Sequence, residues 1–224
     1  MPSADQRFGR PSECPTAERA TRPDRHPVLA GIGARTTYEG LTFLSGRIGE
    51  KFAGEEITVY SDPQHPDIPY ALFDSEGVSR REAIWIDRGV FSGMWWDRWT
   101  AHDHGTEPIP GPGSLCMDGT DRSIEDLIAG IDRGILVTHV WYVRPVKADQ
   151  TLVTGMTRDG TFRIEGGRSG PPVRNLRFND TGLGMLRRAV AVGRPERCIS
   201  QESPPSVVPP LVVRDWNFVG VTEF

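Results

Sequence analysis

The chain has 224 residues, 37% of them hydrophobic, and its 26 Lys and Arg against 30 Asp and Glu give a formal net charge of -4. This length fits one large domain or two small ones, and the slightly acidic balance argues against binding to nucleic-acid phosphates. Because no apolar run approaches the roughly 20 residues of a membrane span and no secretory leader follows Met1, we expect a cytoplasmic protein without membrane contact.

Residues 1–35 are predicted to be disordered, and residues 36–224 are predicted to form one domain. The first 27 residues hold five prolines and nine charged side chains without apolar periodicity, so they cannot bury enough surface to offset the entropy lost on ordering. The whole chain contains 25 Gly and 19 Pro, which favours many short strands and turns over a helical bundle.

The first predicted element of the domain is an amphipathic helix that ends at Gly54. Its apolar stripe has steps of three, four and four residues, which match one face of a helix. The stripe consists of Leu41, Leu44, Ile48 and Phe52. Strands are expected next over residues 56–60, 82–86 and 90–96, and Asp87-Arg88-Gly89 between the last two predicts a hairpin with glycine at a positive φ.

A Pro- and Gly-rich segment over residues 102–121 is predicted to be a loop, and loops of this size in compact domains are commonly functional. A second helix is predicted to begin after Ser123, because Asp126 three residues later resembles a capping box. Its apolar face is Ile124, Leu127, Ile128 and Ile131, and Gly134 is expected to end it.

The remainder of the chain reads mostly as sheet. A long strand is predicted over residues 136–146, and strands over 151–157 and 161–165 flank Asp159-Gly160, a strong hairpin signal. The last predicted elements are a strand over 173–178, a helix over 183–192 and a closing strand over 212–219. This order is not βαβ, so we expect an α+β fold that is β-rich, with a curved, mostly antiparallel sheet or partial barrel and about three helices.

Three candidate groups for chemistry remain open at this stage. His102 and His104, with Cys116 and His139 further on, are zinc-ligand types, but no CxxC or HExxH spacing fixes a site, and solvated loop histidines are the simpler alternative. His139 in the middle of a predicted strand is most simply a hydrogen-bonded structural residue. The cluster of Trp95, Trp96 and Trp99 fits either core packing or a peptide-binding aromatic surface.

Cys14, Cys116 and Cys198 are too few and too scattered for a disulfide framework.

Several ordered segments together resemble the C-terminal domain of the TldD/PmbA (TldE) family of bacterial metallopeptidases. They are residues 39–63 (EGLTFLSGRIGEKFAGEEITVYSDP), 123–146, 152–167, 171–180 (PPVRNLRFND) and the ending 207–224. The resemblance implies a cytosolic protease of two related subunits, of which the TldD type carries zinc and the PmbA type lacks it. It also implies peptide substrates, and an N-terminal α/β domain of about 200 residues that is missing here.

The zinc motif of TldD-type subunits, HExxxH, is not matched. At the corresponding place His26 is followed by Pro27, with no adjacent Glu and no second His five residues on. Two imidazoles one helical turn apart would both ligate zinc with the Glu as general base, and proline disfavours that helix. Cys198 lies where the family supplies a late cysteine ligand, but without its glycine-rich surroundings. The sequence therefore assigns no catalytic, cofactor-binding or metal-binding residue and no cofactor, and it resembles the PmbA side of the family.

These observations predict a non-catalytic, subunit-like scaffold. Its partner would be a zinc-bearing TldD-type subunit or a second copy of the chain, and together they would act on a peptide substrate. Two alternatives stay open: a divergent metallopeptidase with zinc held by His102, His104 and Cys116 or Cys198, or a non-functional fragment of a longer gene. A domain that has lost a neighbour should expose an apolar patch, expected at the 41–52 helix or at Trp95–Trp99.

Overall fold

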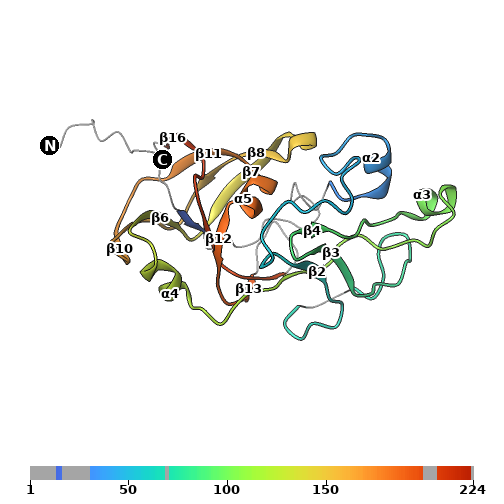
Figure 1. Cartoon of the computed structure of the whole chain (residues 1–224), viewed down its shortest axis with the longest axis horizontal. Helices are drawn as coiled ribbons and strands as arrows, with labels where there is room; N and C mark the ends of the chain where they lie inside the picture. Colours follow the sequence, from blue (N-terminus) through green and yellow to red (C-terminus); the bar gives the residue numbers. More distant parts are fainter. Residues whose placement is uncertain (1–13, 17–30, 69–70, 199–205, 223–224) are drawn as a thin grey trace.

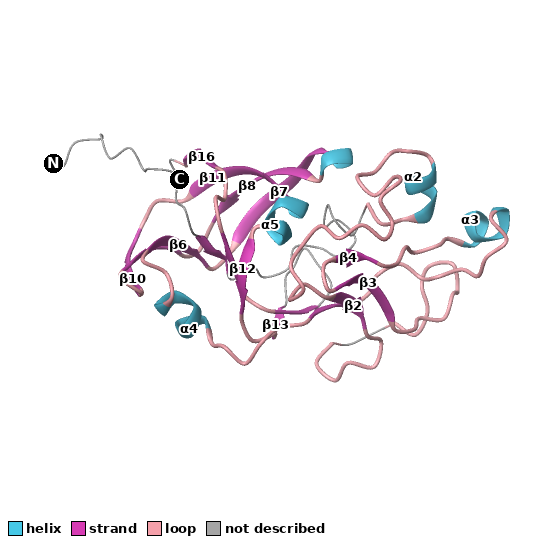
Figure 2. Ribbon diagram, in the orientation of Figure 1, coloured by secondary structure: helices cyan, strands magenta, loops and turns pink. Residues whose placement is uncertain are grey.

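A computed structural model describes residues 14–16, 31–68, 71–198 and 206–222. Within these ranges the chain forms three sheets of short strands, with four short α-helices and one 3-10 helix, and none of the sheets closes into a barrel. The molecule is elongated, with the first two sheets toward one end and the third toward the other (Figure 1). Long loops join the short strands, most of all around the third sheet (Figure 2). The predicted β-rich, mostly antiparallel α+β fold is confirmed.

The first sheet has six strands. Along the chain these are β1 (Cys14–Thr16), β6 (Arg133–Val137), β9 (Thr161–Glu165), β10 (Arg168–Pro172), β12 (Ala189–Val192) and β15 (Leu211–Val213). Their order in the sheet is β10-β9-β6-β1-β15-β12, and all neighbours are antiparallel except β1 and β6. The helix α4 (Ile124–Ala129) packs on this sheet through a small apolar cluster that contains Leu127, Ile164 and Val212.

The second sheet is a four-stranded antiparallel sheet, in the order β16-β11-β8-β7. Its strands are β7 (Val140–Lys147), β8 (Leu152–Thr157), β11 (Leu176–Thr181) and β16 (Phe218–Val221). The 3-10 helix η1 (Ala148–Gln150) closes the turn between β7 and β8, and α5 (Gly182–Arg187) follows β11 directly. Both η1 and α5 therefore stand at the same end of the sheet.

The third sheet has six short strands in the order β13-β14-β5-β2-β3-β4. They are β2 (Val59–Ser61), β3 (Ala83–Asp87), β4 (Val90–Phe91), β5 (Leu115–Met117), β13 (Glu196–Cys198) and β14 (Ser206–Val208). The helices α2 (Ala34–Tyr38) and α3 (Arg98–Asp103) belong to the same end of the molecule (Figure 1). One large core joins all three sheets; it contains Trp85 of β3, Phe178 of β11 and Val213 of β15.

Two local predictions are confirmed in detail. The turn Arg88-Gly89 joins β3 to β4, with φ of 45° and 78° at its two residues, as a type I′ hairpin requires. A side chain at Gly89 would collide with the Ala53 carbonyl, so both the turn and the packing require glycine. At α4, Ser123 and Asp126 form the predicted capping box. That helix ends at Gly130 and not near Gly134, because β6 already begins at Arg133.

The helix predicted over residues 41–52 is wrong. The segment is a series of turns, in which Gly46 and Gly49 have φ of 73° and 82°, a conformation that interrupts a right-handed helix. Leu44 is buried, whereas Leu41 and Ile48 are exposed, so the apparent stripe does not face one surface.

The hairpin predicted at Asp159-Gly160 is also wrong, although the strands on both sides exist. β8 pairs with β7 and β9 pairs with β6, so the two strands belong to different sheets. The long strand predicted over 136–146 is split in the same way, into β6 and β7. The four strands form one continuous antiparallel ribbon that bends between two sheets, and Asp159-Gly160 lies at the bend opposite Thr138, whose N–H donates to the Gly160 carbonyl.

In the C-terminal third of the chain, the boundaries between elements differ from the predicted ones. The helix predicted over 183–192 is the short helix α5 followed by β12, and the closing strand over 212–219 is divided between β15 and β16. Asp215, with a φ of 53°, turns the chain from the first sheet to the second. The predicted loop over 102–121 contains β5, a wholly buried strand.

The predicted domain boundary near residue 35 is not tested and stays a prediction. Most of residues 1–30, including His26, lie outside the described residues. Within residues 1–30, Cys14–Thr16 forms β1. Ile32, which follows this segment, is completely buried. Among the described residues, no helix has the length and apolar character needed to cross a membrane.

Candidate functional site

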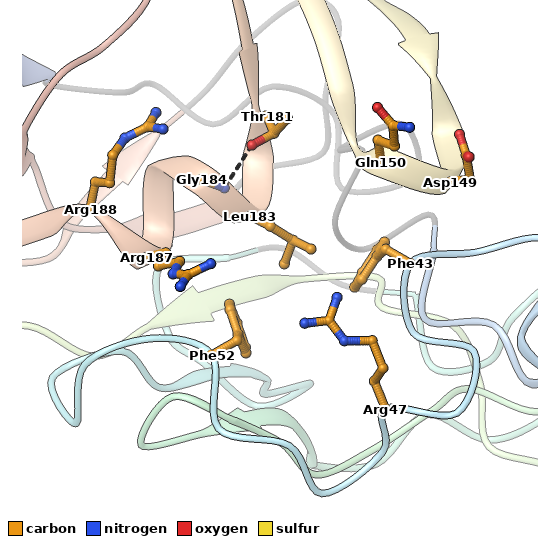
Figure 3. A pocket seen from close by; sticks show the side chains of 10 residues that line it. All are labelled: Phe43, Arg47, Phe52, Asp149, Gln150, Thr181, Leu183, Gly184, Arg187 and Arg188. Carbon is orange, nitrogen blue, oxygen red and sulfur yellow. Dashed lines mark hydrogen bonds between the residues drawn. The ribbon is translucent and has the colours of Figure 1, made fainter.

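A pocket of about 600 Å³ lies between α5, η1 and the turns before β2 (Figure 3). Three segments that are far apart in the sequence supply its walls. The lining residues are Phe43, Arg47, Phe52, Asp149, Gln150, Thr181, Leu183, Gly184, Arg187 and Arg188.

One side of the pocket is apolar and rigidly packed. Phe52 stacks on Phe91 of β4 with ring centroids 4.0 Å apart, and Phe43 packs against the same ring at 5.4 Å. Phe91 is completely buried, so it fixes both rings from the core side. Leu183 of α5 faces them across the pocket (Figure 3).

The helix α5 is positioned by hydrogen bonds at its start. The Thr181 hydroxyl accepts from the Gly184 N–H at 2.9 Å, and the Leu183 N–H donates to the Thr151 hydroxyl at 3.2 Å. A side chain at position 184 would collide with the Thr181 hydroxyl, so glycine is needed for this cap. Thr151, at the end of η1, is completely buried and has a φ of 53°. These contacts hold η1 and α5 together as one wall.

Two of the three arginines that line the pocket are held by carboxylates. Arg188 donates from Nη2 to both oxygens of Asp180, each at 2.7 Å, and from Nε to the Arg214 carbonyl. Arg47 donates to the two Glu50 oxygens at 2.6 and 2.9 Å, which keeps the pKa of Glu50 below its usual value.

Arg187 differs from the other two arginines. Its side chain is exposed at the pocket, and it makes no hydrogen bond or ion pair within the described part of the chain. Its charge contributes to the lowered pKa of Glu50, after the larger effect of Arg47. The pocket therefore combines an apolar wall with one guanidinium whose donors are available to a ligand.

Within the described part of the chain, the metal candidates predicted from the sequence do not gather at this pocket or at another point. In the ranges that the structure describes, no three His, Cys, Asp or Glu side chains are grouped so as to hold a metal ion. His102 lies on α3, and the ring of His104 stacks on Tyr38 with centroids 4.3 Å apart. Nδ1 of His139 lies 2.9 Å from Oδ2 of Asp159 at the bend of the ribbon, and Cys198 lies on β13. The expectation of a chain without zinc ligands remains a prediction, because His26 lies outside the described residues.

Cys116 is engaged in the core of the third sheet. It lies on β5 with 1% of its surface exposed, and burial raises the pKa of its thiol from 9.0 to about 11. A metal-ligating cysteine must be a thiolate, which this environment disfavours.

The thiol of Cys116 is expected to resist modification in the folded protein. In a variant with Cys14 and Cys198 replaced by serine, we expect about a hundredfold less thiolate at pH 8 when folded than when unfolded, because the raised pKa favours the protonated form. Its labelling by Ellman's reagent should be slow, and should reach the ordinary rate in urea. Rapid labelling of the folded variant at pH 8 would contradict the buried placement.

The tryptophan cluster is divided between core and surface. Trp95 is half-buried against Gly33, whereas Trp99 is 61% exposed, with the Arg35 guanidinium 4.6 Å above its ring. Leu41 is 58% exposed. Single exposed side chains therefore occur in both segments where an apolar patch was expected, while the extent of such a patch stays a prediction.

Sequence comparison decides what kind of domain carries this pocket. A family model described as the PmbA/TldA metallopeptidase C-terminal domain matches residues 26–220. The chain belongs to the PmbA/TldD metallopeptidase family. This PmbA/TldD domain begins, by that match, at His26, within the segment expected to be disordered.

Two curated relatives carry the name "Metalloprotease". The protein from Methanothermobacter thermautotrophicus is 27% identical over 172 residues, which are 69% of this chain and 36% of that protein. The protein from Archaeoglobus fulgidus is 26% identical over 150 residues, which are 66% of this chain and 32% of that protein. The PmbA/TldD domain described here thus spans about a third of these relatives.

Solved structures agree with the fold. TldE from Thermococcus kodakarensis superposes with a TM-score of 0.80 at 25% identity, over 95% of this chain and 51% of TldE. A Thermotoga maritima protein described as a modulator of a DNA gyrase superposes with a TM-score of 0.79 at 22% identity, over 93% of this chain and 50% of that protein. At this identity the second likeness concerns the fold alone.

Among the described residues, no donor set matches the zinc ion that the family implies. The thiol of Cys116 is buried, the ring of His104 is stacked, and His139 is paired with Asp159. The described residues therefore do not fit a zinc ion.

The pocket arginines were not found by sequence reasoning. Arg47 lies in a segment that was expected to be a helix, and Arg187 and Arg188 lie in another. The adjacent pair Arg187-Arg188 was the one local signal, and it does not reveal that Asp180 neutralises only the second arginine.

Proposed function

We propose that this chain is a non-catalytic, PmbA/TldE-type scaffold that supports peptide proteolysis by a zinc-bearing TldD-type subunit. The observation that carries the proposal is the superposition on TldE over 95% of the chain with a TM-score of 0.80. The engagement of Cys116, His104 and His139 in other contacts supports the non-catalytic role. The family supplies the expectation of peptide substrates and of a partner, with a second copy of this chain as the other candidate partner.

Exposed sheet edges suit a role in holding extended peptides or a partner. β7 is one of the two edge strands of the second sheet, and most of its residues are exposed. Arg144 lies over the exposed ring of Tyr142, at 4.3 Å from its centroid. An unpaired edge can add a strand of another chain through backbone hydrogen bonds, with side chains such as these selecting the sequence.

A metallopeptidase acting by itself is the second candidate. The name of the two curated relatives favours it, and it would need His102, His104 and Cys116 or Cys198 at one point. Those side chains form no metal-binding group among the described residues. A fragment of a longer gene, without a function of its own, is the third alternative.

Reconstitution tests the proposed function. We expect the purified chain to form a stable complex with the TldD-type subunit of the same organism, measured by gel filtration with light scattering. Cleavage of an unfolded protein such as casein should require both subunits and should stop on chelation. The His104→Ala variant should behave as the wild type in this assay. Chelator-sensitive cleavage by the chain alone, lost in His104→Ala, would establish the second candidate. Absence of any complex, together with absence of cleavage, would favour the fragment.

A further inference from the structure

We infer that the pocket between α5, η1 and the turns over residues 43–52 binds the C-terminal residue of a peptide, with its free carboxylate at Arg187 and an apolar side chain against Phe43, Phe52 and Leu183. The volume of about 600 Å³ lies within the range of about 300–1,000 Å³ that is usual for small-ligand sites. The assignment of the ligand to a peptide rests on the proposed function. The recognition of a carboxylate joined to an apolar side chain rests on the geometry of the site alone.

The charged side of the pocket has one arginine that is not neutralised, which suits a ligand with one carboxylate. Glu50 neutralises Arg47 and Asp180 neutralises Arg188, whereas Arg187 has neither a hydrogen bond nor an ion pair within the described ranges. Among the lining residues Asp149 alone is acidic, and it stands across the pocket from Arg187 (Figure 3). A guanidinium offers paired donors that fit the two oxygens of a carboxylate.

Arg47 can add a second donor to the same ligand. Its contacts with Glu50 use Nε and Nη2, and its Nη1 makes no hydrogen bond to any described residue. In Figure 3 the guanidinium of Arg47 points into the same space as that of Arg187. A monoanion placed between them gains two charged donors.

The apolar side of the pocket distinguishes this ligand from a small inorganic anion. Phe52 and Phe43 are held by the buried ring of Phe91, so their faces toward the pocket are fixed before a ligand arrives. Leu183 closes the opposite side (Figure 3). Burial of one Leu or Phe side chain there would stabilise the complex through the hydrophobic effect. A carboxylate joined to an apolar side chain is the chemistry of a peptide C-terminus such as leucine or phenylalanine.

The experiment uses the full chain and synthetic peptides, with binding measured by isothermal titration calorimetry. An N-acetylated tetrapeptide that ends in leucine with a free carboxylate is expected to bind. The same peptide with a C-terminal amide should bind at least tenfold more weakly. A peptide that ends in serine should also bind more weakly, because the apolar contact is lost. N-acetylleucine should bind more weakly than the tetrapeptide; equal affinity would overturn the assignment to a peptide.

Matched variants separate the site from nonspecific charge. Arg187→Gln should weaken binding of the free-carboxylate peptide at least tenfold while the circular-dichroism spectrum and melting temperature stay unchanged, since Arg187 makes no bond within the described structure. Arg133→Gln, which removes an exposed arginine from β6, should leave the affinity unchanged. Failure of the carboxylate peptide to bind, or equal binding by Arg187→Gln, would overturn the inference. A chain that forms the productive complex but shows no such binding would lose this inference and keep the proposed function.

Discussion

Replacing Arg188 by methionine is expected to lower the free energy of unfolding by about 3 kcal/mol. Asp180 is 5% exposed and accepts from Arg188 and from the Asn217 N–H at 2.9 Å. Removal of the guanidinium leaves a buried carboxylate without its counterion, a cost that is reduced here because the Arg188 side chain is 33% exposed. Urea denaturation followed by circular dichroism measures the change.

The reason for this large effect is the position of Asp180 in the fold. Asp180 is the last residue but one of β11 in the second sheet, whereas Arg188 also donates to the Arg214 carbonyl just after β15 of the first sheet. The contact therefore ties α5, and with it the pocket wall, to both sheets. Arg188→Lys keeps the charge and should lose less stability than Arg188→Met. Equal and small losses, below about 1 kcal/mol, would show that the pair is screened by solvent.

Trp85→Ala is expected to cost about 3–5 kcal/mol, the usual range for removal of a buried aromatic side chain. Trp85 is 1% exposed in the core that joins the three sheets, and its indole N–H donates to the Ser61 hydroxyl at 2.9 Å. The alanine variant would leave both a cavity and an unsatisfied buried hydroxyl. The same denaturation experiment measures the loss.

Trp99→Ala is the matched control for this prediction. Trp99 is 61% exposed, and the guanidinium of Arg35 lies 4.6 Å from the centroid of its ring. Its removal should cost less than about 1 kcal/mol. Equal losses in the two variants would mean that the third sheet is not packed into the common core as described.

Local turn chemistry predicted a hairpin correctly at one place and wrongly at another. Arg88-Gly89 and Asp159-Gly160 both have positive φ at both residues. After Arg88-Gly89 the chain pairs with the strand it has just left. After Asp159-Gly160 it pairs with β6, since β6 and β7 already form the other half of the ribbon. A turn signal therefore locates a reversal or bend, whereas the partner strand is decided by long-range pairing.

The capping box of α4 and the existence of most strands could be predicted because they depend on neighbours within a few residues. The pocket could not, because it depends on contacts between segments that are distant in the sequence, such as Leu183 facing Phe52. The apolar stripe at 41–52 misled for a related reason: its periodicity fits a helix, but two glycines at positive φ prevent one. The family resemblance predicted the fold more completely than the local rules did, because it compares several ordered segments of the chain at once.

The zinc content of the purified chain tests the central claim most directly. After dialysis against excess zinc and removal of free metal, mass spectrometry of the metal is expected to find well below one zinc per chain. The same value is expected for the His104→Ala variant, because the His104 ring is stacked on Tyr38 and packs edge-to-face against Trp96. Retention of one zinc per chain that is lost in His104→Ala, with chelator-sensitive peptide cleavage by the chain alone, would contradict the account and identify the chain as a metallopeptidase in its own right.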